Sequence, residues 1–143
     1  MKMKRLISIF LLIFSLTACS AESGRDNSSS DLAGQSSSQG YRQISIEEAK
    51  NLMARESGYI ILDVRRPDEF AEGHIPNAIN IQNEIIGDSE ISELPNKDQL
   101  ILVYCRSGRR SKEASEKLVA LGYTNIVEFG GIIDWTGETE KGE

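Results

Sequence analysis

The chain has 143 residues, with 22 acidic and 16 basic side chains and a net charge of −6 at neutral pH. This acidic excess excludes a general binder of nucleic acid or of anionic membrane surfaces, because both need clustered positive charge. Cys19, Cys105 and His74 are the only cysteines and the only histidine, which is too few for a usual tetrahedral zinc site. We therefore expect neither a bound metal nor another cofactor.

The first 18 residues have the pattern of a targeting segment. Lys2, Lys4 and Arg5 form a basic start, and residues 6–16 are largely apolar. Leu16-Thr17-Ala18 directly precede Cys19 and place small residues at the expected cleavage site of a signal peptide. The apolar run is too short to cross a bilayer readily. A cysteine directly after Leu-Thr-Ala resembles the lipobox of bacterial lipoproteins, in which the cysteine is lipidated and becomes the new N-terminus. We therefore predict a lipoprotein signal peptide over residues 1–18; the alternative is an ordinary signal peptide with a coincidental Cys19.

Residues 19–40 are predicted to be a flexible tether that begins with the lipidated Cys19. Ser, Gly, Asn, Gln and Asp dominate this segment, and Leu32 is its only large apolar residue, so it cannot form a core. Loss of the signal peptide removes three basic residues and no acid, which makes the mature chain more acidic. The lipid would anchor the protein outside the cytoplasm, at a cell membrane or on the periplasmic side of an envelope membrane, and would be its only membrane contact.

Residues 41–143 have the size of one domain and alternate between strand and helix patterns. Strands are predicted over residues 41–44, 59–63, 78–81, 100–104 and 125–129, and helices over residues 46–56, 68–71, 83–94, 111–121 and from 132 to 135. Ser45 and Glu48 form a capping box before the first helix. Gly87 makes the helix over residues 83–94 the weakest of these predictions. The alternation indicates an α/β domain with a parallel sheet and helices on both of its faces.

The residues around Cys105 have the pattern of a reactive thiol. An apolar strand ends at Cys105, and a short cationic turn leads into the helix predicted from Ser111. Ligands of parallel sheets bind at the carboxyl ends of the strands, where Cys105 falls. The free N–H groups of such a turn, the helix N-terminus and the arginines Arg106, Arg109 and Arg110 all favour a thiolate. The alternatives are an inert buried cysteine and arginines that only form a solvated helix start.

The spacing from Cys105 to the arginines separates two classes of thiolate enzyme. Cysteine-dependent phosphatases use Cys-x5-Arg, a loop wide enough to wrap a phosphoryl group. The residue at that spacing is Ser111, whereas Arg110 closes a tighter Cys-x4-Arg loop. This segment resembles the active loop of the rhodanese, or sulfurtransferase, family. Other stretches similar to the family follow in its order: Asp63-Val64-Arg65, Glu69-Phe70, residues 73–80 (Gly-His-Ile-Pro-Asn-Ala-Ile-Asn), and Gly130-Gly131 with Trp135.

The resemblance implies a rhodanese-like three-layer sandwich with a central parallel sheet of about five strands. It also implies that Cys105 carries a persulfide, taking sulfur from a small anionic donor such as thiosulfate and passing it to a thiol or a cyanide-like acceptor. The N–H groups of the loop, residues Arg106, Ser107, Gly108, Arg109 and Arg110, would hold the extra sulfur. Either Arg106 or Arg110 would bind the donor.

Other residues and other functions remain as alternatives. Asp63 is expected either to orient an arginine, such as Arg65 or one in the loop, or to be a local turn acid. His74 is expected to be structural rather than a base for Cys105, and Trp135 to anchor the core. Lipidation of Cys19 would leave Cys105 without an internal partner, which disfavours a thiol–disulfide oxidoreductase. A phosphatase or arsenate-handling enzyme on the same fold and a non-catalytic binding module are the competing functions.

Overall fold

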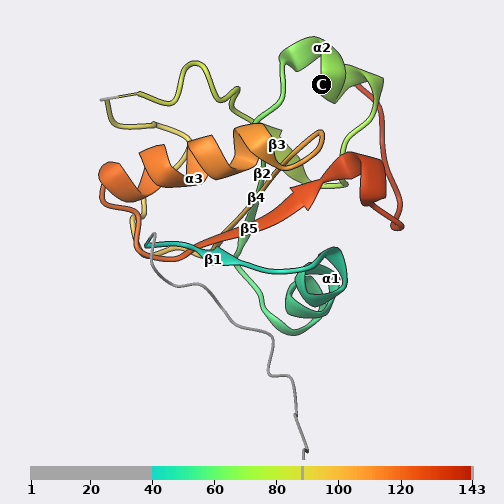
Figure 1. Ribbon diagram of the computed structural model, residues 1–143, viewed down its shortest axis with the longest axis horizontal. Coiled ribbons are helices and arrows are strands. Elements are labelled where there is room, and N and C mark those ends of the chain that lie inside the picture. The colour runs from blue at the N-terminus through green and yellow to red at the C-terminus, as the bar shows by residue number, and fades with distance from the viewer. Residues whose placement is uncertain (1–39, 88, 143) are drawn as a thin grey trace, which may run out of the picture. The chain divides into compact units, whose positions relative to one another are not determined.

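The computed structural model describes residues 40–87 and 89–142, which form an α/β domain around a five-stranded parallel sheet (Figure 1). The predicted fold class, an α/β sandwich with a central parallel sheet, is therefore confirmed. The strands are β1 (Arg42–Gln43), β2 (Ile60–Asp63), β3 (Ala78–Asn80), β4 (Ile101–Cys105) and β5 (Ile126–Gly131), and they lie in the order β1-β5-β4-β2-β3. The predicted signal peptide, Cys19 and the tether up to residue 39 lie outside the described residues.

Strand β4 lies in the middle of the sheet and is the most buried strand. All five of its residues are buried, and its side chains alternate between the two faces, as strand geometry requires. Ile101, Val103 and Cys105 join the hydrophobic cluster on one face, and Leu102 and Tyr104 join the cluster on the other. A continuous apolar run suits a parallel strand that is covered on both sides. The sheet therefore holds Cys105 at the end of its most protected strand.

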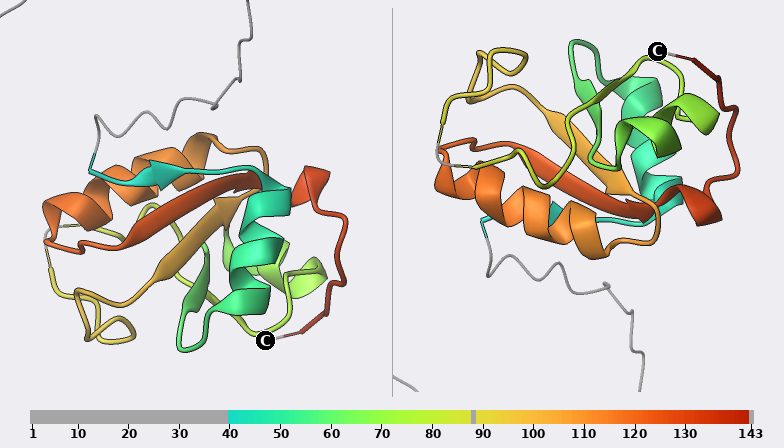
Figure 2. Two further views of the ribbon diagram at one scale, coloured as in Figure 1. Left: turned by 90° about the horizontal axis from the view of Figure 1, so that it is seen from below. Right: turned by 90° about the horizontal axis from the view of Figure 1, so that it is seen from above.

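Two helices cover opposite faces of the sheet (Figure 2). Helix α1 (Ile46–Arg55) begins with the predicted capping box, in which the Ser45 hydroxyl accepts from the Glu48 N–H at 3.2 Å and the Glu48 carboxylate accepts from the Ser45 N–H at 2.8 Å. Helix α3 (Arg109–Ala120) buries Ala114 and Leu118 against the other face. A short helix, α2 (Pro67–Glu72), follows β2. No helix in the described part of the chain is long and apolar enough to cross a membrane.

The segment after β3 shows that one predicted helix is wrong. Residues 83–87 and 89–94 form turns instead of a helix. Ile86 and Leu94 are still buried, at 2% and 1% exposure, and pack into the cluster beneath α3. Gly87 and the serines of this segment lower its helix propensity, because glycine costs backbone entropy and serine side chains compete for backbone hydrogen bonds. Tertiary packing of separate apolar residues replaces the amphipathic face of a helix here.

Two element ends near Cys105 also differ from the sequence-based prediction. Helix α3 begins at Arg109, two residues before the predicted start at Ser111, because Gly108 caps it with a left-handed φ of 100°. The predicted terminal helix is a single 3-10 turn, η1 (Ile132–Asp134). The earlier start of α3 leaves only residues 106–108 between β4 and this helix.

Candidate active site

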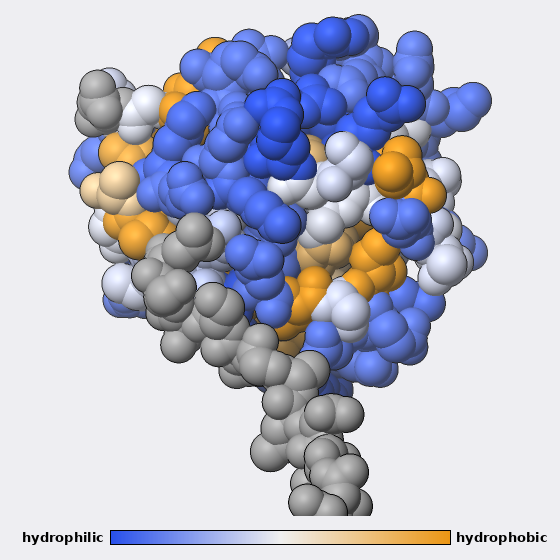
Figure 3. All heavy atoms as spheres, viewed as in Figure 1, coloured by the Kyte–Doolittle hydropathy of each residue, from blue (hydrophilic) through white to orange (hydrophobic). Residues whose placement is uncertain are grey.

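Cys105 lies beside a cleft at the carboxyl end of the sheet. The cleft has a volume of about 720 Å³, and its lining comes from α2, the loop after β4, the start of α3 and η1. On the face shown in Figure 3, hydrophilic residues cover α2 and the start of α3. Cys105 itself is only 1% exposed. A donor in this cleft would thus meet a sulfur atom that is largely shielded from bulk water.

The loop from Cys105 to Arg110, here called the cysteine loop, forms a concave N–H site for an anion. The Gly108 N–H donates to the Cys105 sulfur at 3.1 Å. Because Gly108 has a left-handed φ of 100°, its amide turns inward, a conformation that a side chain would strain. The first N–H groups of α3 have no partner within the helix and carry its partial positive charge. These N–H groups are donors for an anion bound at the cysteine loop.

A glycine of β5 supports this loop from below. A Cβ atom on Gly131 would lie 2.1 Å from the carbonyl oxygen of Arg106, so no other residue fits there without moving the loop. Strand β5 also contains a bulge: Val103 of β4 lies opposite Glu128, but Cys105 lies opposite Gly131. Bulges of this kind increase local twist and re-aim side chains near active sites. The Gly130-Gly131 pair thus shapes the floor of the cysteine loop.

The arginines that line the cleft differ in their partners. Arg110 binds Glu69 through two hydrogen bonds of 2.7 and 2.9 Å. Arg66 binds Asp68 at 2.7 Å, and Arg109 binds Glu113 at 2.6 Å. Arg65 binds Asp63 at 2.6 Å. Within residues 40–87 and 89–142, Arg106 is the cleft arginine that forms no salt bridge.

The pair of Arg110 and Glu69 joins the cysteine loop to α2. The hydrogen bonds from Arg110 lower the pKa of Glu69 to about 2. In return, the pKa of Arg110 is raised, chiefly by Glu69 and in smaller part by the charge of Cys105. Glu69 lies in one of the stretches that resemble the rhodanese family, but its partner could not be predicted from the sequence, since Glu69 and Arg110 are 41 positions apart.

Asp63 and Arg65 form a buried pair at the end of β2. The Asp63 carboxylate, which is fully buried, accepts from the Arg65 backbone N–H at 2.9 Å and from its guanidinium at 2.6 to 3.0 Å. Arg65 also donates to the carbonyl of Gly73 at 2.8 Å. Asp63 therefore combines the two roles that the sequence left open, a turn acid and an orienting partner, and the arginine that it orients is Arg65.

A buried serine and a buried glutamate lie behind Cys105. The Ser111 hydroxyl is 3.5 Å from the Cys105 sulfur and donates to Glu128 Oε1 at 2.6 Å. Neither residue was predicted to belong to the site. The available signal was the period of β5: Glu128 alternates with buried apolar residues and shares the α3 face with Ile126, so a carboxylate there had to be buried.

His74 and Trp135 do not line the cleft. The His74 ring stacks on Phe70 at a centroid distance of 3.7 Å, its Nδ1 lies 2.9 Å from the Phe70 carbonyl, and its Nε2 lies 3.3 Å from Glu140. Trp135 packs near Phe129, with centroids 6.1 Å apart. These contacts give both residues structural roles, as the sequence analysis expected.

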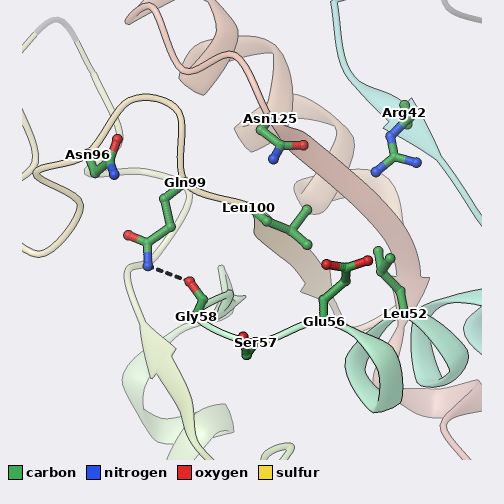
Figure 4. Close-up of a pocket in the computed structure, with 9 residues that line it drawn as sticks. All are labelled: Arg42, Leu52, Glu56, Ser57, Gly58, Asn96, Gln99, Leu100 and Asn125. Carbon is green, nitrogen blue, oxygen red and sulfur yellow. Dashed lines mark hydrogen bonds between the residues drawn. The ribbon is translucent and has the colours of Figure 1, made fainter.

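Another cavity, of about 460 Å³, lies near the amino ends of the strands (Figure 4). Its lining includes Arg42, Glu56 and Gln99, and the Gln99 side chain donates to the Gly58 carbonyl at 2.8 Å. No cysteine, histidine or lysine lines it. The Cys105 cleft is the larger of the two and lies at the carboxyl edge, where parallel sheets bind ligands. We therefore take the Cys105 cleft as the candidate active site.

The fold and this cleft define an α/β protein with a cysteine loop at the carboxyl end of its central strand. The chain matches the family model of the rhodanese-like domain over residues 45–138 and belongs to that family. A sulfurtransferase of Allochromatium vinosum is 36% identical over 94 residues, which cover 65% of this chain and 86% of that protein. The thiosulfate sulfurtransferase PspE of Escherichia coli is 35% identical over 81 residues, covering 57% of this chain and 78% of that protein.

Solved structures are similar in the same region. A rhodanese-like domain protein from Staphylococcus aureus superposes with a TM-score of 0.61 at 33% identity, covering 71% of this chain and 98% of that chain. A rhodanese with anions from E. coli superposes with a TM-score of 0.54 at 33% identity, covering 59% of this chain and 99% of that chain. The relatives support the enzyme class predicted from the sequence, a rhodanese-like sulfurtransferase.

Proposed function

We propose that this protein is a sulfurtransferase that moves a sulfane sulfur from a small anionic donor to a thiol or a cyanide-like acceptor through a persulfide on Cys105. The observation that carries the proposal is the hydrogen bond from the Gly108 N–H to the Cys105 sulfur, at 3.1 Å, beside a cleft with arginines. Such a donor stabilises negative charge on sulfur both before and after the sulfur atom is gained.

The first step is an attack by the Cys105 thiolate on the outer sulfur of a donor such as thiosulfate. A new bond forms between the two sulfur atoms, the sulfur–sulfur bond of the donor breaks, and its electron pair leaves with sulfite. The negative charge then sits on the outer sulfur of the persulfide. The Gly108 N–H, which donates to the Cys105 sulfur, and the free N–H groups of the first turn of α3 would stabilise that charge.

Arg106 is the residue best placed to attract the donor. Arg110 and Arg109 are each paired with a glutamate, which offsets most of their charge. Arg106 is exposed, lines the cleft and forms no salt bridge within the described residues. This distinction favours Arg106 over Arg110, the two donor-binding candidates that the sequence left open. A related E. coli rhodanese was solved with anions, which agrees with an anionic donor.

In the second step the acceptor attacks the outer sulfur of the persulfide. The bond between that sulfur and Cys105 breaks, and its electron pair returns to Cys105 as a thiolate. Donor and acceptor therefore use the same cleft in turn and need not be bound together. The charge on the enzyme sulfur is the same at the start and at the end of the cycle.

The proposed place of action is outside the cytoplasm, with lipidated Cys19 as the anchor and residues 20–40 as a tether. The support is the sequence of residues 1–19, with its basic start, short apolar run and Leu-Thr-Ala-Cys motif. Growth of an expressing bacterium with labelled fatty acid should label the wild-type protein but not Cys19→Ala. An unlabelled wild-type protein in the soluble fraction would contradict the anchor without touching the sulfurtransferase proposal.

The decisive experiment for the reaction is intact mass measurement after incubation with thiosulfate. The mass of the wild type should increase by one sulfur atom, cyanide should remove it as thiocyanate, and Cys105→Ser should show neither change. A titratable thiol that gains no sulfur and yields no thiocyanate would overturn the proposal. Turnover of an aryl phosphate that is lost in Cys105→Ser would point to the phosphatase instead, and a role that survives Cys105→Ser would point to a binding module.

A further inference from the structure

The Ser111 hydroxyl lies between two ionisable groups, the thiol of Cys105 and the carboxylate of Glu128. The proposed reaction uses only the first of them. The Ser111 oxygen is 3.5 Å from the Cys105 sulfur and 2.6 Å from Glu128 Oε1. Ser111 and Cys105 are no more than 1% exposed, and Glu128 is 2% exposed. The three side chains therefore form a continuous hydrogen-bonded array from the nucleophile into the interior of the domain.

The fold holds Glu128 in this position from several sides. Strand periodicity turns Glu128 toward α3, and the bulge of β5 brings the Gly130 N–H to within 2.9 Å of the same carboxylate oxygen. Ser111 is the third residue of α3, so its hydroxyl lies at the positive end of that helix. Glu128 also lines a small cavity of about 350 Å³, on the other side of Ser107 and Gly108 from the Cys105 cleft.

The chemistry of Ser111 makes Cys105 and Glu128 compete. A hydroxyl has one proton to donate, and the acceptors within reach of Ser111 are the Glu128 carboxylate at 2.6 Å and the carbonyls of Gly108 and Gly130 at 3.0 and 3.3 Å. A Cys105 thiolate would compete with Glu128 for this proton. Two negative charges in so little water repel each other strongly, which favours a state with one charge and one shared proton. The short distance to Glu128 and the longer one to Cys105 agree with a thiol that donates to Ser111 while Ser111 donates to the carboxylate.

We infer that Glu128 is a positioning residue that accepts the Cys105 proton through the Ser111 hydroxyl, so that the thiol and the carboxylate share one proton during sulfur transfer. This inference deepens the proposed sulfurtransferase reaction and rests on it for its purpose. The benefit lies in the charge of the donor: with Glu128 protonated, the thiolate attacks an anionic donor without a second anion behind it.

The proton balance closes over the proposed cycle. When Cys105 ionises, its proton passes to Ser111, and the Ser111 proton passes to Glu128, leaving a thiolate and a neutral carboxyl group. The thiolate gains sulfur from the donor, and the persulfide carries the negative charge. When the acceptor removes the sulfur, the thiolate that remains takes a proton back along the same route, and Glu128 becomes a carboxylate again.

Several other charged groups face the array from neighbouring elements. Arg110 and Lys112 belong to α3, Glu48 belongs to α1, and Glu69 of α2 is bound to Arg110. Burial raises the pKa of Tyr41 above its usual value, and the charges of Glu116 and Glu128 add to this effect, so the phenol stays neutral. The sulfur also faces the cleft, whose further charged residues are Arg65, Arg66, Glu72, Glu84, Arg106 and Arg109.

The test is the pH dependence of Cys105 alkylation by iodoacetamide, which needs no sulfurtransferase activity. In the wild type the rate should rise in two steps, with a shoulder where the thiol and Glu128 hold one proton between them. In Glu128→Gln the oxygen for Gly130 remains but the proton acceptor is lost. A single step should result, at a lower pH than the upper step of the wild type, because a negative charge is gone.

Three further variants separate this effect from a change in folding or in net charge. Ser111→Ala removes the hydroxyl that both groups share and should shrink the lower step, while the charge of Glu128 still acts on Cys105 through space. Ser115→Ala removes a buried hydroxyl one turn further along α3, and Glu116→Gln removes an exposed charge of the same helix; both should keep two steps. A single step in the wild type, or two steps in Glu128→Gln, would overturn the inference.

A second measurement follows Glu128 itself. Infrared difference spectra between the thiol and the persulfide form of the wild type should show a carboxyl band appear as a carboxylate band disappears. The same spectra of Glu128→Gln should lack this change. Persulfide formation without a carboxyl band would overturn the inference that Glu128 and Cys105 share a proton, and would leave the sulfurtransferase proposal intact. Failure to form the persulfide would overturn the sulfurtransferase proposal itself.

Discussion

The guanidinium of Arg110 grips the carboxylate of Glu69 with two hydrogen bonds of 2.7 and 2.9 Å, and so ties the first turn of α3 to α2. Both side chains are mostly shielded, at 16% and 18% exposure. The pair thus closes one side of the Cys105 cleft. Arg110, the last arginine of the Cys-x4-Arg loop, therefore connects the cysteine loop to α2 at the wall of the cleft. Its positive charge is largely offset by the carboxylate of Glu69.

The first prediction concerns the pH dependence of this pair. Arg110 lowers the pKa of Glu69 from 4.5 to about 2, so the pair stabilises the folded state above pH 4.5 and loses this effect as the pH falls toward 2. Glu69→Gln should lower the free energy of unfolding at neutral pH by about 1–3 kcal/mol, as expected for a charged hydrogen bond. Urea unfolding at neutral and acidic pH measures the difference, which should shrink in acid. Glu72→Gln, an exposed change on the same helix, is the control, and an equal loss in that variant would contradict the prediction.

The second prediction separates the arginines of the cysteine loop. Arg106→Ala should raise the KM for thiosulfate by about tenfold, the size of one charge-assisted hydrogen bond, and leave kcat nearly unchanged. Arg109→Ala, whose side chain is exposed and paired with Glu113, is the matched control and should change KM little. Steady-state kinetics at two salt concentrations check this, because added salt should narrow the difference. A larger KM effect from Arg109→Ala would reverse the assignment.

The third prediction tests the support beneath the loop. Gly131→Ala would place a methyl group 2.1 Å from the Arg106 carbonyl oxygen. Overpacking of this kind should cost about 1–3 kcal/mol of folding free energy and slow sulfur transfer by displacing the loop. Gly73→Ala serves as the control, since its backbone is extended and its added methyl group would meet nothing within 4 Å. Thermal unfolding and persulfide formation measure both effects, and equal behaviour of the two variants would refute the prediction.

The fourth prediction concerns the buried pair of Asp63 and Arg65. Asp63→Asn leaves the Arg65 guanidinium, which is 7% exposed, without its counter-charge. Removing one partner of a buried ion pair should cost about 3–5 kcal/mol of folding free energy. Denaturant unfolding measures the loss, and Asp68→Asn, which breaks an exposed pair with Arg66, should cost far less folding free energy. Similar losses in the two variants would contradict the prediction that the buried pair contributes more to folding than the exposed pair.

Much of the fold was predictable because local signals and tertiary structure agree. The Ser45 and Glu48 capping box fixes the start of α1 through contacts within a few residues. The apolar run of β4 identified the central strand, because only a strand covered on both faces can be apolar throughout. The helix predicted over residues 83–94 failed for the opposite reason. Its apolar residues are buried one by one against the cluster under α3, so their spacing reflects this packing and did not indicate a helix.

The candidate site divides in the same way. Cys105 and the residues of its loop are adjacent in the chain, and their spacing was enough to indicate a thiol loop of the rhodanese type. The partners that set the charge of this loop come from distant segments. Glu69 reaches Arg110 from 41 residues away, and Glu128 reaches Ser111 from 17 residues away. No local pattern connects such pairs, because the fold alone brings them together.

The sequence by itself therefore determined the α/β class, the central strand, the cysteine at the end of that strand and the length of its loop, since each depends on residues close together in the chain. Only the tertiary structure decided which arginine of the cleft is without a salt bridge and which carboxylate lies behind the thiol. The physical reason is that charge and proton affinity depend on distance in space: Glu69 offsets Arg110, Arg106 has no salt bridge within the described residues, and Glu128 lies one hydroxyl group away from Cys105.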